Sequence, residues 1–192
     1  MELLLSELNH RWANALQVIS ASLHLCASRS TSRESMVCGL NKIQQQVQAM
    51  AALHQRLSRA PELGTHIGGY CNALCLDTIL SFGCESITPV FEASSIPLSQ
   101  GCAMRLGALV VELMTNAIKH GAVKANDGVV WMSLHLVGGD WVELSVRDNF
   151  AAPHRSDPPR PRMVEALALS LSGELTIRVR PTYTTRLRFP RS

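Results

Sequence analysis

The sequence predicts an α+β protein in which an N-terminal helical hairpin precedes an α/β two-layer sandwich. Two long stretches near the start of the chain carry apolar residues at helical spacing. Proline and glycine then punctuate the chain at Pro61 and Gly64. Several later segments alternate apolar and polar residues, a pattern typical of half-buried β-strands. We therefore expect two domains, residues 1–62 and residues 63–192.

The hairpin consists of two predicted helices. The first covers residues 2–28, and its apolar stripe comprises Leu5, Leu8, Trp12, Leu16, Ile19 and Leu23. Ser32 is expected to cap the second, in which apolar residues recur about every 3.5 positions, as in coiled coils. These residues are Val37, Leu40, Ile43, Val47, Met50, Leu53 and Leu57. Because a two-helix hairpin cannot cover both stripes, we expect two copies to pair into a four-helix bundle and form a homodimer.

The second domain is predicted to contain both helices and strands. The expected helices cover residues 66–82, 98–120 and 163–172, and the expected strands cover residues 85–93, 129–136, 141–147, 174–179 and 184–189. Pro89 cannot donate a backbone hydrogen bond, which favours the sheet edge for its strand. Gly138 and Gly139 predict a hairpin turn. Helices packed on one mixed or antiparallel sheet make a two-layer sandwich.

Composition narrows the class of protein. A hydrophobic content of 46% with 17% charged residues is ordinary for a soluble globular chain of 192 residues. We find no apolar run of bilayer-spanning length and no signal-peptide pattern, so we expect a cytoplasmic protein without a membrane partner. The six cysteines lack the paired spacing of a zinc site, so we expect buried, reduced thiols and no metal site.

Arginines are concentrated in the last quarter of the chain, although the net charge is only +3. Alternation along residues 174–180 places Arg178 and Arg180 on the outer face of a strand. A solvated strand face explains much of this pattern, and a surface for an acidic partner is the alternative. We expect no nucleic-acid partner, because Tyr183 alone supplies an aromatic residue among these arginines.

His10 is the leading candidate for chemistry. It falls off the apolar stripe of the first helix, so its imidazole is expected to face solvent. Asn14 lies one helical turn further on, and Arg11 follows His10 directly. A lone surface histidine is usually only solvated. However, an imidazole that is neutral near pH 7, with an amide and a guanidinium beside it, can accept and release a phosphoryl group.

This stretch resembles the phosphoacceptor box of bacterial two-component histidine kinases, in the branch whose box reads H-R-x-x-N-x-L-Q. Here the box is His10-Arg11-Trp12-Ala13-Asn14-Ala15-Leu16-Gln17. The resemblance continues through residues 41–44 and 50–57, which look like the second helix of the same branch. It implies that His10 is the catalytic phosphoacceptor and that Arg11 and Asn14 orient the ring and the phosphoryl oxygens.

Residues 112–121 resemble the N-box of the ATPase fold shared by histidine kinases and gyrase. They read Glu112-Leu113-Met114-Thr115-Asn116-Ala117-Ile118-Lys119-His120-Gly121. The resemblance implies that Asn116 would help to hold Mg²⁺ and that Glu112 would lie near the attacked phosphate, with Lys119 in the same motif. It also implies that Asp148 would contact the adenine amino group.

The chain departs from that family after Asp148. The family has glycines there, whereas this chain continues Asn149-Phe150-Ala151-Ala152-Pro153 and contains no glycine from Asp140 through Ser172. Glycines let backbone amides close on phosphates, and proline removes amide donors. We therefore favour a vestigial nucleotide site without a cofactor of its own. Unusual ATP–Mg²⁺ binding, or a scaffold or nucleic-acid role, are the alternatives.

These observations predict a dimeric histidine phosphotransfer protein. His10 would take a phosphoryl group from the aspartyl phosphate of one response-regulator receiver domain and pass it to another. The Mg²⁺ for this step would sit on the receiver domain. The alternatives are an ATP-dependent histidine kinase without a sensor, and a non-catalytic regulator that sequesters a partner.

Overall fold

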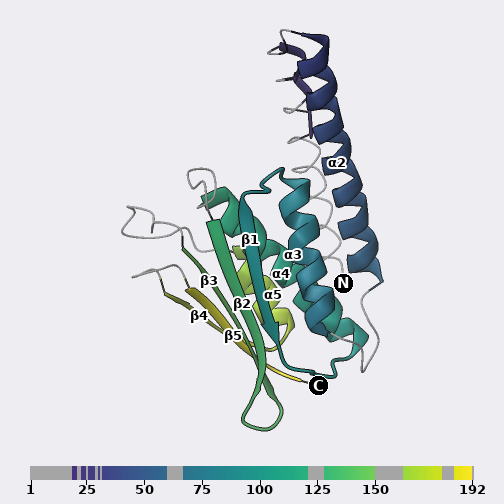
Figure 1. Cartoon of the computed structure of the whole chain (residues 1–192). Coiled ribbons are helices and arrows are strands. Elements are labelled where there is room, and N and C mark those ends of the chain that lie inside the picture. The colour runs from purple at the N-terminus through teal and green to yellow at the C-terminus, as the bar shows by residue number, and fades with distance from the viewer. Residues whose placement is uncertain are drawn as a thin grey trace.

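The computed structural model describes residues 19–20, 23–24, 26–28, 30, 32–59, 67–120, 128–149, 162–178 and 184–191. Its helices are α2 (Arg33–Ser58), α3 (Ile67–Ser81), α4 (Gln100–His120) and α5 (Arg162–Ser170). Its strands are β1 (Ile87–Ala93), β2 (Gly128–Val137), β3 (Trp141–Asp148), β4 (Glu174–Arg178) and β5 (Thr184–Pro190). The long helix α2 lies beside α3 and extends beyond the sheet domain (Figure 1). The mixed α and β composition is therefore as predicted.

The five strands form one mixed sheet in the order β1-β2-β3-β5-β4. β1 runs parallel to β2, and the other neighbours are antiparallel. The edge position predicted for the Pro89 strand is confirmed, because β1 has one neighbour. Gly138 and Gly139 both adopt positive φ angles, 60° and 86°, in the turn between β2 and β3, as the predicted hairpin requires.

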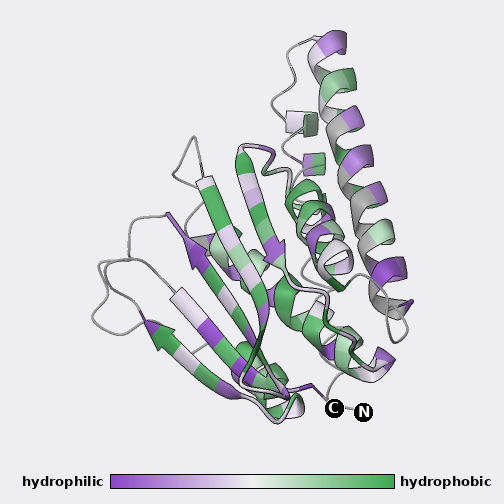
Figure 2. Ribbon diagram, turned by 60° about the horizontal axis from the view of Figure 1, so that its bottom comes forward, coloured by the Kyte–Doolittle hydropathy of each residue, from purple (hydrophilic) through white to green (hydrophobic). Residues whose placement is uncertain are grey.

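The helices α3, α4 and α5 cover one face of the sheet and leave the other face open (Figure 1). Val142 and Leu144 of β3 and Leu187 and Phe189 of β5 point into the core and are almost completely buried. The residues between them, such as Arg186 and Arg188, lie on the open face. Apolar and polar residues accordingly alternate along these strands in Figure 2. The sheet domain is therefore a two-layer sandwich.

Helix α4 is the centre of the core. Leu106, Leu109, Val110 and Met114 are completely buried. Gly107 permits close packing on α3, since a Cβ there would lie 2.5 Å from the hydroxyl of Tyr70. The stretch Gln100–Lys119 is long and apolar enough to cross a membrane, but its 18-residue window is 67% buried in the protein. The sequence prediction that no such stretch exists was wrong, and the burial of α4 in a core explains its composition.

Helix α2 begins as predicted at Ser32. The hydroxyl of Ser32 accepts a hydrogen bond from the Ser35 amide, and the Ser35 hydroxyl accepts one from the Ser32 amide, both at 3.1 Å. Near the other end of the helix, Arg56 Nε donates to Asp77 Oδ2 of α3 at 2.6 Å. This ion pair and the packing of α2 along α3 attach the hairpin to the sheet domain.

The described residues before α2 support a helical reversal. Residues 26–28 are helical, and a Cβ on Gly39 of α2 would collide with the Cys26 sulfur. The Cys26 thiol also lies 3.6 Å from the carbonyl oxygen of Met36, to which it donates. The end of the first helix therefore packs on the start of α2, as a hairpin requires. The predicted four-helix bundle stays a prediction, because it needs a second chain.

The cysteines are free, as expected, but they are not all buried. Cys71, Cys75 and Cys102 lie in the core, whereas Cys38 on α2 is exposed, contrary to the prediction. Burial raises the pKa of Cys75 to about 12 and that of Cys71 well above its ordinary range. Within the described ranges, no group of three or more His, Cys, Asp or Glu side chains could hold a metal ion.

Candidate functional site

The ends of three elements, two of which carry predicted site residues, meet at one end of the sheet. The C-terminal end of α4, the start of β2 and the end of β3 lie together there (Figure 1). The register agrees, because Asp148 at the end of β3 pairs with Val130 near the start of β2. Helix α4 brings Glu112, Asn116 and Lys119 toward this end. The fold therefore gathers the N-box motif and Asp148 from segments far apart in the sequence.

Glu112 and Asn116 form a direct pair on α4. They lie one helical turn apart, and Asn116 Nδ2 donates to Glu112 Oε1 at 3.1 Å. A carboxylate only accepts hydrogen bonds, so this contact fixes which end of the Asn116 amide faces Glu112. The carbonyl oxygen Oδ1 then points away from Glu112, and such an oxygen suits a hard cation. Both side chains are half-buried, whereas Lys119 is exposed.

Asp148 and Asn149 lie next to each other at the end of the β2–β3 strand pair and differ in their burial. Asp148 is 7% exposed, so its carboxylate lies within the domain. Asn149 lies at the surface and uses both backbone and side chain: its amide donates to the Val129 carbonyl at 3.2 Å, and its Oδ1 accepts from the Val129 amide at 2.8 Å. The sequence did not single out Asn149. The sequence feature that could have indicated it is an amide side chain directly after a predicted strand. There the side chain can take the place of a backbone hydrogen-bond partner on the neighbouring strand.

The remaining predicted residues lie outside the described part of the chain. These are His10, Arg11 and Asn14 of the phosphoacceptor box, and the glycine-free segment at 150–161. The structure therefore places the N-box residues and Asp148, and it brings Glu112 and Asn116 into contact. The histidine box stays a prediction from the sequence.

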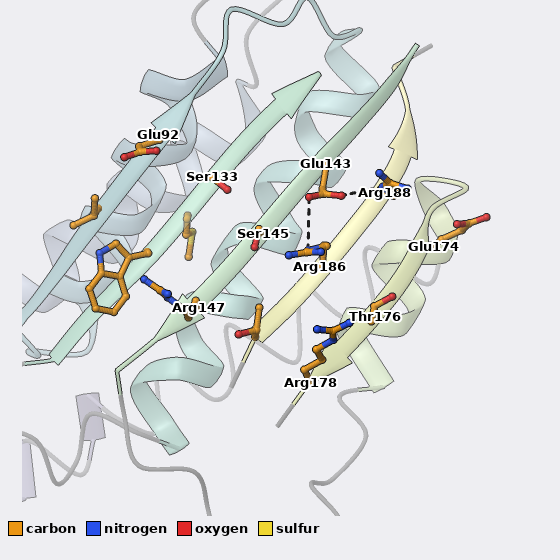
Figure 3. A pocket seen from close by; sticks show the side chains of 14 residues that line it. Glu92, Ser133, Glu143, Ser145, Arg147, Glu174, Thr176, Arg178, Arg186 and Arg188 are labelled. Carbon is orange, nitrogen blue, oxygen red and sulfur yellow. Dashed lines mark hydrogen bonds and ion pairs between the residues drawn. The ribbon is translucent and has the colours of Figure 1, made fainter. Parts of the chain in front are cut away.

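A second polar surface lies on the open side of the sheet. A shallow groove of about 830 Å³ runs across four arginines and several hydroxyl side chains on this side (Figure 3). We name these four arginines, Arg147, Arg178, Arg186 and Arg188, the arginine face. The prediction that Arg178 faces outward is confirmed, and Arg180 lies outside the described residues.

The arginine face is only partly neutralised. Arg188 Nε donates to Glu143 Oε2 at 2.9 Å, whereas Arg186 Nε lies 3.6 Å from Glu143 Oε1. The Arg147 guanidinium lies over the Trp131 ring, 4.7 Å from its centroid. No local sequence pattern indicates this aromatic partner, because Trp131 is 16 residues away and becomes a neighbour only through the pairing of β2 with β3.

The chain is similar in sequence to known proteins. Residues 7–82 match the HisKA_2 family model, described as histidine kinase. Residues 7–82 are therefore similar to histidine kinases. It is 24% identical over 184 residues to blue-light-activated histidine kinase 2 of Erythrobacter litoralis. That alignment covers 90% of this chain and 52% of the relative, so the chain spans about half of the relative's length.

Solved structures agree at the level of the fold. The histidine kinase domain of a blue-light activated histidine kinase from Erythrobacter litoralis has a TM-score of 0.60 at 18% identity, and the match covers 93% of this chain and 94% of that one. A longer structure of the same Erythrobacter kinase gives 0.61 at 22% identity, covering 90% and 63%. The Acinetobacter baumannii histidine kinase AdeS gives 0.51 at 12% identity, covering 95% and 98%. At these identities the likeness concerns the fold alone.

Proposed function

We propose that the chain is a two-component histidine phosphotransfer protein that relays a phosphoryl group between receiver-domain aspartates through His10. The match of residues 7–82 to the histidine-kinase family model, a segment that includes His10, Arg11 and Asn14, supports phosphoryl chemistry at His10. The observation that favours relay over ATP use is the absence of glycine from Asp140 through Ser172. An imidazole nitrogen of His10 attacks the phosphorus of an aspartyl phosphate, and the aspartate carboxylate leaves. The reverse transfer to a second aspartate regenerates the neutral ring.

Most of the rate of such a transfer comes from positioning and charge neutralisation. Arg11 would neutralise the phosphoryl oxygens, and Asn14 would orient the ring by a hydrogen bond. The receiver domain would supply Mg²⁺. No ATP is required, because the aspartyl phosphate is already activated.

The end of β3 supports relay over ATP use. Glycine in the turn after the aspartate would let backbone amides approach a phosphate. Here the Asn149 side chain is engaged with the Val129 amide, and Phe150 follows it in the sequence. Pro153, Pro158, Pro159 and Pro161 further reduce the number of amide donors in the next segment.

The exposed apolar side chains of α2 support a homodimer. Met36, Val37, Leu40 and Val47 are each between 42% and 49% exposed. Burying large apolar side chains stabilises an interface by about 1.5–3 kcal/mol each. A second copy packed on this surface would complete a four-helix bundle and present its outer side to receiver domains.

An ATP-dependent histidine kinase is the second candidate, and a specific observation favours it. The Glu112–Asn116 pair fits part of an ATP–Mg²⁺ site, because it turns an amide oxygen away from the carboxylate and leaves it suited to a hard cation. Asp148 is buried at the same end of the sheet. If ATP bound there, it would supply the phosphoryl group, while Asn116 would hold the cation and Asp148 would recognise the base.

Two parallel incubations separate these candidates. One uses ATP labelled at the γ-phosphate with Mg²⁺, and the other uses a receiver domain carrying labelled aspartyl phosphate. Relay predicts acid-labile labelling of the protein from the receiver alone. Labelling from ATP would promote the kinase, and an intact dimer that takes label from neither source would indicate a regulator that only sequesters a partner.

A further inference from the structure

Three residues of the arginine face, Arg147, Arg178 and Arg186, occupy strand positions next to Thr184. Strand pairing places Trp131, Arg147, Thr184 and Arg178 in a single row across β2, β3, β5 and β4. Arg186 follows Thr184 by two residues on β5 and therefore lies on the same face in the next row. Figure 3 shows Arg147, Arg186 and Arg178 standing on three strands of this open face.

The spacing lets the three guanidinium groups reach a common point. Arg147 and Arg178 lie two strands apart, which is about 10 Å between their backbones. Arg186 is a diagonal neighbour of both, at roughly 7–8 Å. An arginine side chain can span most of these distances, so all three could converge above Thr184 once Arg147 leaves the Trp131 ring and Arg186 turns from Glu143. Guanidinium groups bind phosphate oxygens in a planar, two-pronged geometry.

The positive charges of this cluster are only partly balanced by the described acidic side chains. Glu143 accepts a hydrogen bond from Arg188 and forms a longer ion pair with Arg186, whose Nε lies 3.6 Å from the other carboxylate oxygen. The Arg147 guanidinium lies over the Trp131 ring, and within the described residues it forms no ion pair. In the described part of the chain, no ion pair involves Arg178. Like charges on adjacent sheet positions repel, so an anion bound between them would relieve that repulsion.

We propose that Arg147, Arg178 and Arg186 bind the phosphate group of a small phosphorylated ligand above Thr184. Three converging cations match the three terminal oxygens and the double negative charge of a phosphate monoester better than a single carboxylate. The groove of about 830 Å³ falls within the range of small-molecule pockets, and the hydroxyls of Ser145 and Thr176 beside the cluster can bind the rest of a polar ligand.

The same face disfavours a nucleic-acid strand. Glu92 and Glu174 are exposed on it and would repel the phosphates of a long polyanion. The Trp131 ring already has the Arg147 guanidinium over one of its faces, which leaves less of it for stacking on bases. The proposal is independent of the proposed relay function, because the site lies on the opposite side of the sheet from α4.

Calorimetric titration of the full chain with inorganic pyrophosphate, without Mg²⁺ and at low salt, tests the site. The double variant Arg147→Gln/Arg178→Gln should weaken binding by at least about tenfold, because each variant side chain loses charge-assisted hydrogen bonds to the phosphate oxygens. The control is Arg191→Gln, which removes a positive charge outside the cluster, directly after β5, where Arg191 pairs with Asp140 at 3.1 Å. The control should bind almost as the parent does.

A second pair of variants removes a negative charge instead of positive charges. Glu143→Gln frees Arg186 and should tighten binding several-fold, whereas Asp140→Asn makes the same charge change at the hairpin turn and should have little effect. Unchanged circular dichroism would confirm that the variants fold. The proposal is overturned if pyrophosphate does not bind, if the arginine variants and the control weaken equally, or if Asn116→Ala abolishes binding. It is also overturned if a 12-nucleotide single strand binds and pyrophosphate does not.

Discussion

The two longest described helices, α2 and α4, differ in what surrounds them. Helix α4 has 21 residues, and most of its large apolar side chains are buried in the core, whereas Met104 is exposed. Helix α2 has 26 residues, and of its described side chains only Ile43 is buried. Both helices have an apolar stripe in the sequence. An apolar stripe in the sequence therefore shows that a helix needs another apolar surface to cover it. Only the fold determines whether the same chain supplies that surface.

The same contrast divides the proposed functions. The region around α4 has a complete core and an N-box with a hydrogen-bonded Glu112–Asn116 pair. The hairpin region around α2 has unburied apolar surface and, by family resemblance, the phosphoacceptor histidine. We therefore expect changes in the hairpin to alter transfer and assembly, and changes around α4 to alter stability.

The largest expected effect is on phosphoryl transfer. His10→Gln should abolish acid-labile labelling from a phosphorylated receiver domain, because glutamine has no nucleophilic ring nitrogen. The matched control is His24→Gln, in the same predicted helix, where His24 is exposed and Ser28 stands one turn on in place of an asparagine. That variant should label at the parent rate, as should Asn116→Ala. Normal labelling of the His10→Gln protein would refute the phosphoacceptor assignment.

Core truncation in α4 should cost more than truncation in α2. Leu109→Ala is expected to lower the free energy of unfolding by about 2–5 kcal/mol, since it leaves a cavity at a completely buried position. Leu40→Ala, at a side chain that is 47% exposed, should change the stability of the monomer by about 0.5 kcal/mol or less. Urea unfolding at low protein concentration measures both values. Equal losses would mean that α2 is already packed within one chain.

Thiol reactivity should separate the two regions in the same way. At pH 8 a disulfide reagent should modify Cys38 of α2 rapidly, whereas Cys71 and Cys75 should react only after unfolding, because burial protects them and raises their pKa values. The folded pKa of Cys75 is above its ordinary value of 9.0, so thiolate formation favours the unfolded chain. Its contribution to stability is complete below about pH 9 and declines as the pH rises toward 12. Fast modification of Cys75 at pH 8 would contradict this.

The smallest expected effect concerns assembly. If two copies pair through α2, Leu40→Ala should raise the dimer dissociation constant by about tenfold, because an interfacial leucine contributes 1.5–3 kcal/mol. Analytical ultracentrifugation over a concentration series measures this constant. Ser35→Ala is a suitable control, because it alters the exposed cap of the same helix and not its apolar stripe. A parent protein that stays monomeric at micromolar concentration would rule out the bundle.

Local patterns in the sequence predicted most of the elements correctly. Ser32 was predicted to start α2, Pro89 to put its strand at an edge, and Gly138 with Gly139 to make the β-hairpin, and all three predictions hold. Such features depend on the conformational limits of single residues and their near neighbours, which the sequence states directly. The resemblance at residues 10–17 was likewise a local motif, and the family model matches the segment that contains it.

Tertiary structure decided what the sequence left open. Strand order placed Trp131 under Arg147 and three arginines around Thr184, and no spacing along the chain states those neighbours. It also decided that Cys38 is exposed while Cys75 is buried, and that α4 lies in a core although its composition would suit a membrane. The sequence determines which residues can form a helix or a strand. Burial and long-range pairing depend on which elements pack together, because the free energy of packing belongs to the whole domain and not to a local segment.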